Sequence, residues 1–133
     1  MKKAITIICA VLLAVAAHAQ ESPVLVCKIN EDAKVEKWHD KFILGMYDSN
    51  DEFDSLFLGG TPGAAVELLQ SIVTLIEQKG DYIAMKNSGR DCMIINMEDG
   101  TAMVTFSKSK ANPIISATAI KKAIKGIQEY GRK

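Results

Sequence analysis

The chain has 133 residues, of which 48% are hydrophobic, 24% charged and 6% aromatic. This balance is typical of a folded globular protein and excludes an intrinsically disordered chain. The 16 basic and 16 acidic side chains leave no net charge at pH 7. Since the sequence also carries no nucleic-acid-binding motif, we expect no nucleic-acid partner.

Residues 1–19 have the three parts of a secretory signal peptide. Two lysines near the start precede an almost entirely apolar run over residues 4–17, and residues 17–19 (Ala-His-Ala) match the small-x-small pattern for signal peptidase. The apolar run is shorter than the roughly 20 residues of a membrane-spanning helix. We therefore expect cleavage after residue 19 and export of residues 20–133 as one domain, periplasmic or extracellular, without a transmembrane segment.

The first third of the exported part is the hardest to interpret. Residues 24–29 alternate as a strand, whereas residues 31–46 place apolar side chains at helical spacing. Residues 42–47 also fit a strand, because their apolar side chains alternate. Ser49 and Glu52 resemble a capping box that would open a short helix. We favour helices for both segments.

Two amphipathic helices are expected further along the chain. For a helix over about 62–79, Thr61 suits the N-cap and Pro62 the first helical position. A second helix over about 114–130 would begin near Pro113 or Ser116. Each carries isoleucines and other apolar residues at helical spacing on one side, so each needs an apolar surface to pack against.

Residues 81–107 predict a three-stranded antiparallel meander. Asp99-Gly100 suits a two-residue type I′ turn, and this turn would set Ile95 opposite Val104. The apolar residues of all three strands then share one face, which the two helices can cover. The sequence therefore predicts an α+β fold with a three- to four-stranded antiparallel sheet and the helices packed on one face.

The opposite face of this meander is the first candidate for binding. In the predicted register it carries Tyr82, Ile94 and Met103 among polar neighbours, which is too apolar for a fully solvated surface. Either the N-terminal strand covers these side chains, or they form a binding or dimer surface. We take these three residues as candidate binding residues.

The C-terminal part is the second candidate, because it is basic. Residues 101–133 carry 7 basic side chains and a single acidic one, whereas residues 20–100 carry 7 basic and 15 acidic ones. Lys121, Lys122 and Lys125 fall on the outward side of the predicted C-terminal helix. They could bind an anionic partner, which could be a glycan, a lipid headgroup or a protein. The simpler interpretation is a solvated helix face.

Two cysteines, Cys27 and Cys92, remain after cleavage. An exported protein can keep disulfides, and joining these two would close a long loop worth on the order of 4 kcal/mol. If the strand at residues 24–29 crosses the second face of the meander, both sulfur atoms lie in the same layer. If it pairs at the sheet edge instead, the cysteines stay free, so spacing alone does not decide between the two outcomes.

Catalytic and metal sites have weak support in the sequence. His39, beside Asp40, is the sole histidine of the exported part, and no further partners stand at the spacing of a zinc site or a hydrolase. Residues 48–54 offer alternating oxygen ligands like half of an EF-hand loop, but Phe53 stands where that loop needs glycine. We expect no cofactor and no bound metal.

The working hypothesis is an exported, non-catalytic binding module that contacts a protein or a glycan. The alternative hypothesis is a small secreted hydrolase that uses His39 and nearby carboxylates. Substitution of His39 discriminates between them, because a binding module that uses a dispersed surface would be indifferent to it.

Overall fold

The computed structural model describes residues 22–133, so the predicted signal peptide and its cleavage site lie outside the described residues. The fold repeats one order of elements, four strands followed by a helix. The first unit comprises β1 (Val24–Asn30), β2 (Ala33–Trp38), β3 (Lys41–Tyr47), β4 (Phe53–Gly59) and α2 (Pro62–Glu77). The second comprises β5 (Tyr82–Asn87), β6 (Arg90–Asn96), β7 (Thr101–Phe106), β8 (Ile114–Ser116) and α3 (Ala117–Gly131).

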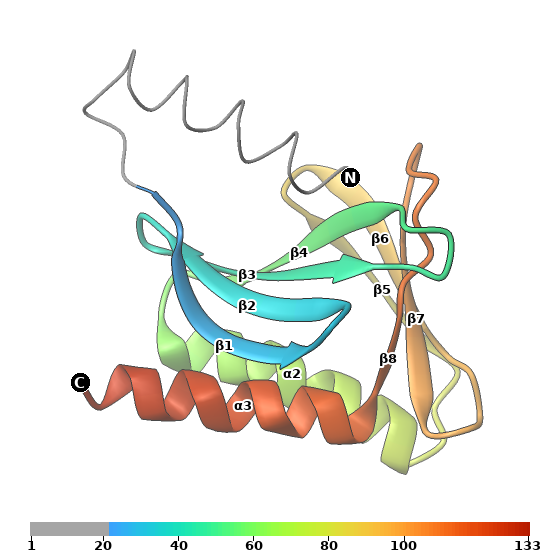
Figure 1. Ribbon diagram of the computed structural model, residues 1–133. Coiled ribbons are helices and arrows are strands. Elements are labelled where there is room, and N and C mark those ends of the chain that lie inside the picture. The colour runs from blue at the N-terminus through green and yellow to red at the C-terminus, as the bar shows by residue number, and fades with distance from the viewer. Residues whose placement is uncertain (1–21) are drawn as a thin grey trace.

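The eight strands form two antiparallel meanders of four strands each, so the predicted α+β class is confirmed. Sheet A has the order β1-β2-β3-β4 and sheet B the order β5-β6-β7-β8. Sheet A curves over α2 and α3, which lie side by side, and sheet B stands near the start of α3 (Figure 1). One hydrophobic core includes residues of both sheets and both helices; among its fully buried side chains are Phe42, Leu44, Leu56, Leu69, Ile72, Ile94 and Ile120.

The first third of the chain is a sheet, and the helical interpretation of residues 31–46 is wrong. Strand alternation prevails there, because Phe42, Leu44 and Met46 are only 1%, 0% and 2% exposed on one side of β3. The expected capping-box helix is wrong as well. Instead, the Asp48 carboxylate accepts hydrogen bonds from the backbone N–H groups of Asn50 and Glu52, at 2.8 and 2.9 Å. An Asx-type turn of this kind reverses the chain into a hairpin.

The predicted meander forms, but its register differs by one residue. Ile94, not Ile95, lies opposite Val104. The connection is longer than the predicted type I′ turn, because residues 97–100 all lie outside the strands and the positive φ angles fall on Glu98 and Gly100. A two-residue turn with two positive φ angles forms instead at Ser88-Gly89, where they are 52° and 79°.

Both helices begin at the capping residues that the sequence indicates. The Thr61 hydroxyl accepts a hydrogen bond from the Ala64 N–H at 3.1 Å, and the Ser116 hydroxyl accepts one from the Ala119 N–H at 3.0 Å. The second helix was expected from about residue 114, but residues 114–116 pair with β7 as β8. The helix therefore starts three residues later, where Ser116 can cap it.

Candidate functional site

The outer face of sheet B carries an apolar row that crosses all four strands. Backbone pairing sets Tyr82 beside Ile95, Ile95 beside Met103, and Met103 beside Ile114. The side chains at the two ends are open to solvent, Tyr82 at 56% and Ile114 at 55% of their full exposure, and the two middle residues are half-buried between them. Met93, next to this row on β6, is 39% exposed.

The structure places two of the three candidate residues on this outer face. Tyr82 and Met103 lie on it, whereas Ile94 is 0% exposed and belongs to the core. The one-residue difference in register is the reason, because it turns Ile94 inward and brings Ile95 to the outer face. Sequence reasoning missed Ile95 and Ile114. The second of these belongs to a strand of three residues, too short for a visible alternation pattern.

The strands give this outer face no net charge. Their outward-facing charged residues are Lys86 and Asp91, whose side chains form an ion pair at 2.7 Å. Both are 72% exposed. The apolar row is therefore bordered, at one end of the sheet, by an ion pair with no net charge. A partner on this face would make mainly apolar contacts and would need no complementary charge.

The lysines predicted as a basic binding surface are partly used inside the molecule. Lys121 on α3 pairs with Glu77 on α2 at 2.5 Å. Lys122 donates a hydrogen bond to the backbone carbonyl of Ile29 at 3.0 Å, which ties α3 to β1. Lys125 is exposed and forms no ion pair within residues 22–133. An anionic partner on this helix stays a prediction.

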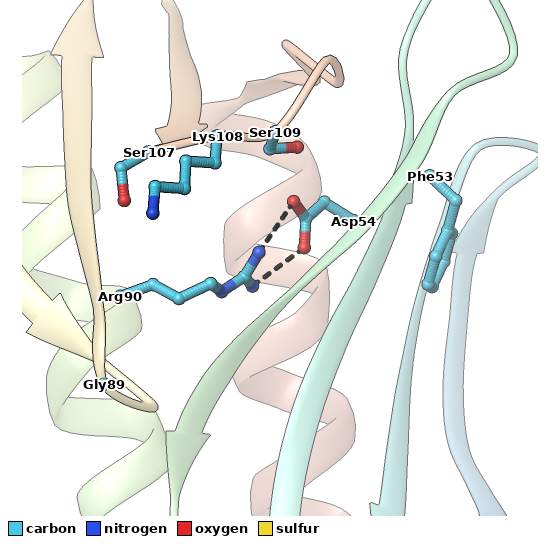
Figure 2. Close-up of a pocket in the computed structure, with 7 residues that line it drawn as sticks. All are labelled: Phe53, Asp54, Gly89, Arg90, Ser107, Lys108 and Ser109. Carbon is cyan, nitrogen blue, oxygen red and sulfur yellow. Dashed lines mark hydrogen bonds and ion pairs between the residues drawn. The ribbon is translucent and has the colours of Figure 1, made fainter.

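A polar cavity of about 530 Å³ lies where the two sheets meet. Its walls come from the start of β4, the β5–β6 turn and the loop after β7, and its lining residues are Phe53, Asp54, Gly89, Arg90, Ser107, Lys108 and Ser109 (Figure 2). The Phe53 ring points away from the other residues that Figure 2 labels, and the lining includes the charged groups of Asp54, Arg90 and Lys108 and the hydroxyls of Ser107 and Ser109.

A bidentate ion pair forms one wall of this cavity. The Asp54 carboxylate accepts two hydrogen bonds from the Arg90 guanidinium, at 2.8 and 3.1 Å, and one from the Ser55 N–H at 2.7 Å. These three bonds hold both carboxylate oxygens of Asp54 against Arg90 and the β4 backbone, so the structural role of this carboxylate is to join the two sheets.

The environment of this pair keeps both groups charged. Burial by itself would raise the pKa of Asp54, but the hydrogen bonds from Arg90 and the Ser55 N–H, the nearby Ser109 side chain and the Arg90 charge outweigh it and hold that pKa below its usual value. The bond to Asp54 likewise raises the pKa of Arg90. Arg90 also lies over the Phe106 ring, with its guanidinium carbon 4.0 Å from the ring centre, a cation–π contact.

A second side chain joins the sheets beside the cavity. The Asn87 amide donates to the Phe57 carbonyl at 2.8 Å and accepts from the Phe57 N–H at 3.0 Å. Asn87 is only 5% exposed. Its side chain satisfies the backbone N–H and carbonyl of Phe57 at the edge of β4, as a neighbouring strand would. Asn87 and Arg90 both flank the β5–β6 turn, which is therefore fixed against sheet A.

The two cysteines are free thiols, so the disulfide weighed from the sequence does not form. Strand β1 pairs at the edge of sheet A, and Cys27 packs on α3 close to Gly126. Cys92 faces the core from sheet B and is 3% exposed. Burial raises the pKa of the Cys92 thiol to about 11, which makes it a structural residue and a poor nucleophile.

The structure places His39 in a turn of sheet A. This residue occupies the β2–β3 turn with a φ of 57°, and its ring stacks on Trp38 with the ring centres 5.7 Å apart. It does not line the cavity described above. Within residues 22–133, no group of three or more histidine, cysteine, aspartate or glutamate side chains could hold a metal ion. The half EF-hand pattern is a turn and a strand, and Asp54 within it pairs with Arg90.

Comparisons with protein-family models, with curated proteins and with solved structures give no match for this chain. Among the described helices, none has the length and apolar character to cross a membrane. We therefore infer the function from the chain's own residues.

Proposed function

We propose that the protein is an exported, non-catalytic binding module that holds an apolar segment of a protein partner on the outer face of sheet B. The observation that supports the proposal is the apolar row Tyr82, Ile95, Met103 and Ile114. Its two end residues, Tyr82 and Ile114, are more than half exposed to solvent. A face of this kind costs solubility unless it binds something. The signal-peptide pattern of residues 1–19 supports export.

The outer face of sheet B is small, which favours a short segment of the partner over the surface of a second folded protein. Three strands of six or seven residues and one of three, about 4.8 Å apart, give a footprint of roughly 350 Å², using standard strand dimensions. A stable interface between two folded proteins buries about 800 Å² on each side. A second copy of this chain would therefore gain too little from this face alone.

The spacing of the row favours a helical segment. Its four residues span about 14 Å at the usual strand separation, and an α-helix advances 5.4 Å per turn. Apolar side chains at positions i, i+3 or i+4, and i+7 of a partner helix would therefore meet successive residues of the row. Because Lys86 and Asp91 neutralise each other, the contact side of that helix needs no charge.

The hydrolase hypothesis finds less support in the geometry. It needs a base near a nucleophile, whereas the Asp54 carboxylate is held by two hydrogen bonds from Arg90 and one from the Ser55 N–H, and its pKa is lowered. His39 lies in a turn on sheet A, outside the cavity. A binding module requires neither group.

Site-specific photo-crosslinking in the producing cells tests the proposal. A photoreactive phenylalanine analogue at position 93 should give one discrete adduct with another protein. The double substitution Tyr82→Asp and Ile114→Asp should abolish that adduct, because it puts two charges into the row. Both side chains are more than half exposed, so the fold tolerates the change. Leu25→Asp, on β1 and 57% exposed, is the matched control and should leave the adduct unchanged.

Three results would overturn the proposal. One is an adduct that survives the double substitution, and another is no adduct at position 93. The third is an adduct at twice the mass of the chain, which would assign the face to a second copy. The export part is tested separately by mass spectrometry of the protein outside the cytoplasm, where the chain should begin at Gln20. Intact Met1 on most of these molecules would contradict it.

A further inference from the structure

The cavity between the sheets has more positive groups than its one carboxylate can neutralise. Asp54 is paired with Arg90. Lys108, on the loop after β7, also lines the cavity, and no ion pair is recorded for its ammonium group within residues 22–133. Figure 2 shows the Lys108 ammonium and the Ser107 hydroxyl pointing toward the Arg90 side chain. The lining therefore carries one unmatched positive charge beside hydroxyl donors.

Arg90 keeps hydrogen-bonding capacity after it binds Asp54. Its three recorded bonds, two to Asp54 and one to the Ser55 carbonyl at 3.2 Å, use three of the five N–H donors of a guanidinium. The Arg90 side chain lines the cavity and is 37% exposed. An anion placed there can take donors from Lys108, Ser107 and Arg90 together.

The loop that carries Lys108 is held in place before any ligand binds. The Ser107 N–H donates to the Asp91 carbonyl at 3.0 Å, and the Ser109 N–H donates to the Phe106 carbonyl at 3.2 Å. Further on, the Asn112 N–H donates to the Asp48 carboxylate at 2.9 Å. Because these bonds fix the backbone on both sides of Lys108, binding needs to order little beyond the lysine side chain itself.

We propose that this cavity binds a small organic carboxylate through Lys108, Ser107 and the free N–H groups of Arg90. A monoanion matches the single unmatched positive charge, whereas a dianionic phosphate would add a second negative charge close to Asp54. The volume of about 530 Å³ is much larger than an ion, so the carboxylate belongs to a larger molecule. Two sources share this chemistry, the C-terminus of a peptide and the acid group of a sugar.

NMR titration of the ¹⁵N-labelled exported protein tests this site. N-acetylglycine represents a peptide terminus, glucuronate a sugar acid, and N-acetylglycinamide an uncharged analogue of the first. At least one carboxylate should give saturable shifts at the amides of Gly89, Ser107 and Ser109, and the tighter of the two identifies the source. The uncharged amide should give none.

Substitutions on the same loop provide the matched comparison. Lys108→Gln should weaken carboxylate binding about tenfold or more, because a charge-assisted hydrogen bond is lost. Lys110→Gln changes an exposed lysine two residues away, outside the cavity lining, and should leave affinity within about twofold. Absence of saturable shifts, equal losses in the two variants, or tighter binding of inorganic phosphate than of either carboxylate would each refute the proposal.

Discussion

Replacing Asp54 by asparagine tests whether the ion pair with Arg90 holds the two sheets together. The amide has nearly the shape of the carboxylate but not its charge, and it presents a donor to groups that donate. Arg90 and the Ser55 N–H direct three hydrogen bonds at this position, so at least one of these bonds must be lost.

The expected magnitude follows from burial. The Asp54 side chain is 11% exposed and that of Arg90 37% exposed, so solvent screens the pair only in part. A hydrogen bond to a charged group contributes about 1.5–3 kcal/mol, and Arg90 can recover some hydration when it is released. We expect Asp54→Asn to lower the free energy of unfolding by about 2 kcal/mol at pH 7, a fall in Tm of about 8 °C for a chain of this size.

The effect should depend on pH in a definite direction. The pKa of Asp54 is lower in the folded protein than in the unfolded chain, so its contribution to stability is complete above about pH 4. As the pH falls through the folded-state pKa, the carboxylate is protonated and the contribution disappears. The stability difference between the parent protein and Asp54→Asn should therefore shrink progressively below about pH 4.

Urea denaturation followed by circular dichroism at pH 7, 5, 4 and 3 measures these quantities. Asp91→Asn is the matched control, because it removes a carboxylate from an ion pair of 2.7 Å in which both partners are 72% exposed. It should change stability by less than about 0.5 kcal/mol. A loss of under 0.5 kcal/mol in Asp54→Asn at pH 7, or a difference that stays constant down to pH 3, would show the reasoning to be wrong.

Two further predictions concern β1 and the thiols. A Cβ atom on Gly126 would lie 2.6 Å from the Cys27 Cβ, so Gly126→Ala should lower the free energy of unfolding by about 1–3 kcal/mol in urea denaturation. Gly63→Ala is the control, because nothing lies within 4 Å of a Cβ atom at that position, and it should raise the free energy of unfolding by up to about 1 kcal/mol. Similar losses of stability in both variants would contradict the close contact between Gly126 and Cys27. Thiol counting on unreduced exported protein should find two reactive thiols in denaturant and only Cys27 in the native state, because Cys92 is buried. Fewer than two in denaturant would indicate a disulfide.

Local signals predicted the parts of the fold that local interactions determine. Both helices start at residues that cap them through contacts three positions away, Thr61 to Ala64 and Ser116 to Ala119. Such contacts are visible in a sequence as residue type and spacing. The alternation of the meander strands was visible for the same reason, because it depends on neighbouring residues alone.

The register between β6 and β7 could not be predicted from the sequence pattern, because two polar side chains stabilise a connection other than the predicted Asp-Gly turn. The Asn96 side chain accepts from the Glu98 N–H at 2.9 Å, and the Asp99 side chain accepts from the Thr101 N–H at 3.1 Å. These bonds stabilise a longer connection, and the shift of one residue exchanges the faces of β6. Ile94 therefore moved from the candidate surface to the core, and Ile95 from the core to the surface.

The cavity could not be predicted from the sequence for a different reason. Its central pair joins residues 36 positions apart in sequence. In the sequence, Asp54 appears only as an oxygen ligand of the incomplete EF-hand pattern, and Arg90 belongs to no recognisable motif. A single chain carries no signal for such a pairing, because it depends on how two sheets approach each other in space.

The side chains at the sheet junction also determine where a partner can bind. Ser55 and Phe57 are two residues apart on β4, so their backbone groups point to the same open edge of sheet A. Arg90 occupies the Ser55 carbonyl and the Asn87 amide occupies both groups of Phe57. An incoming strand would have to displace these bonds before it could extend sheet A at this edge. Recognition through the side chains on the outer face of sheet B requires no such displacement, which is why we assign the partner to a face and not to this edge.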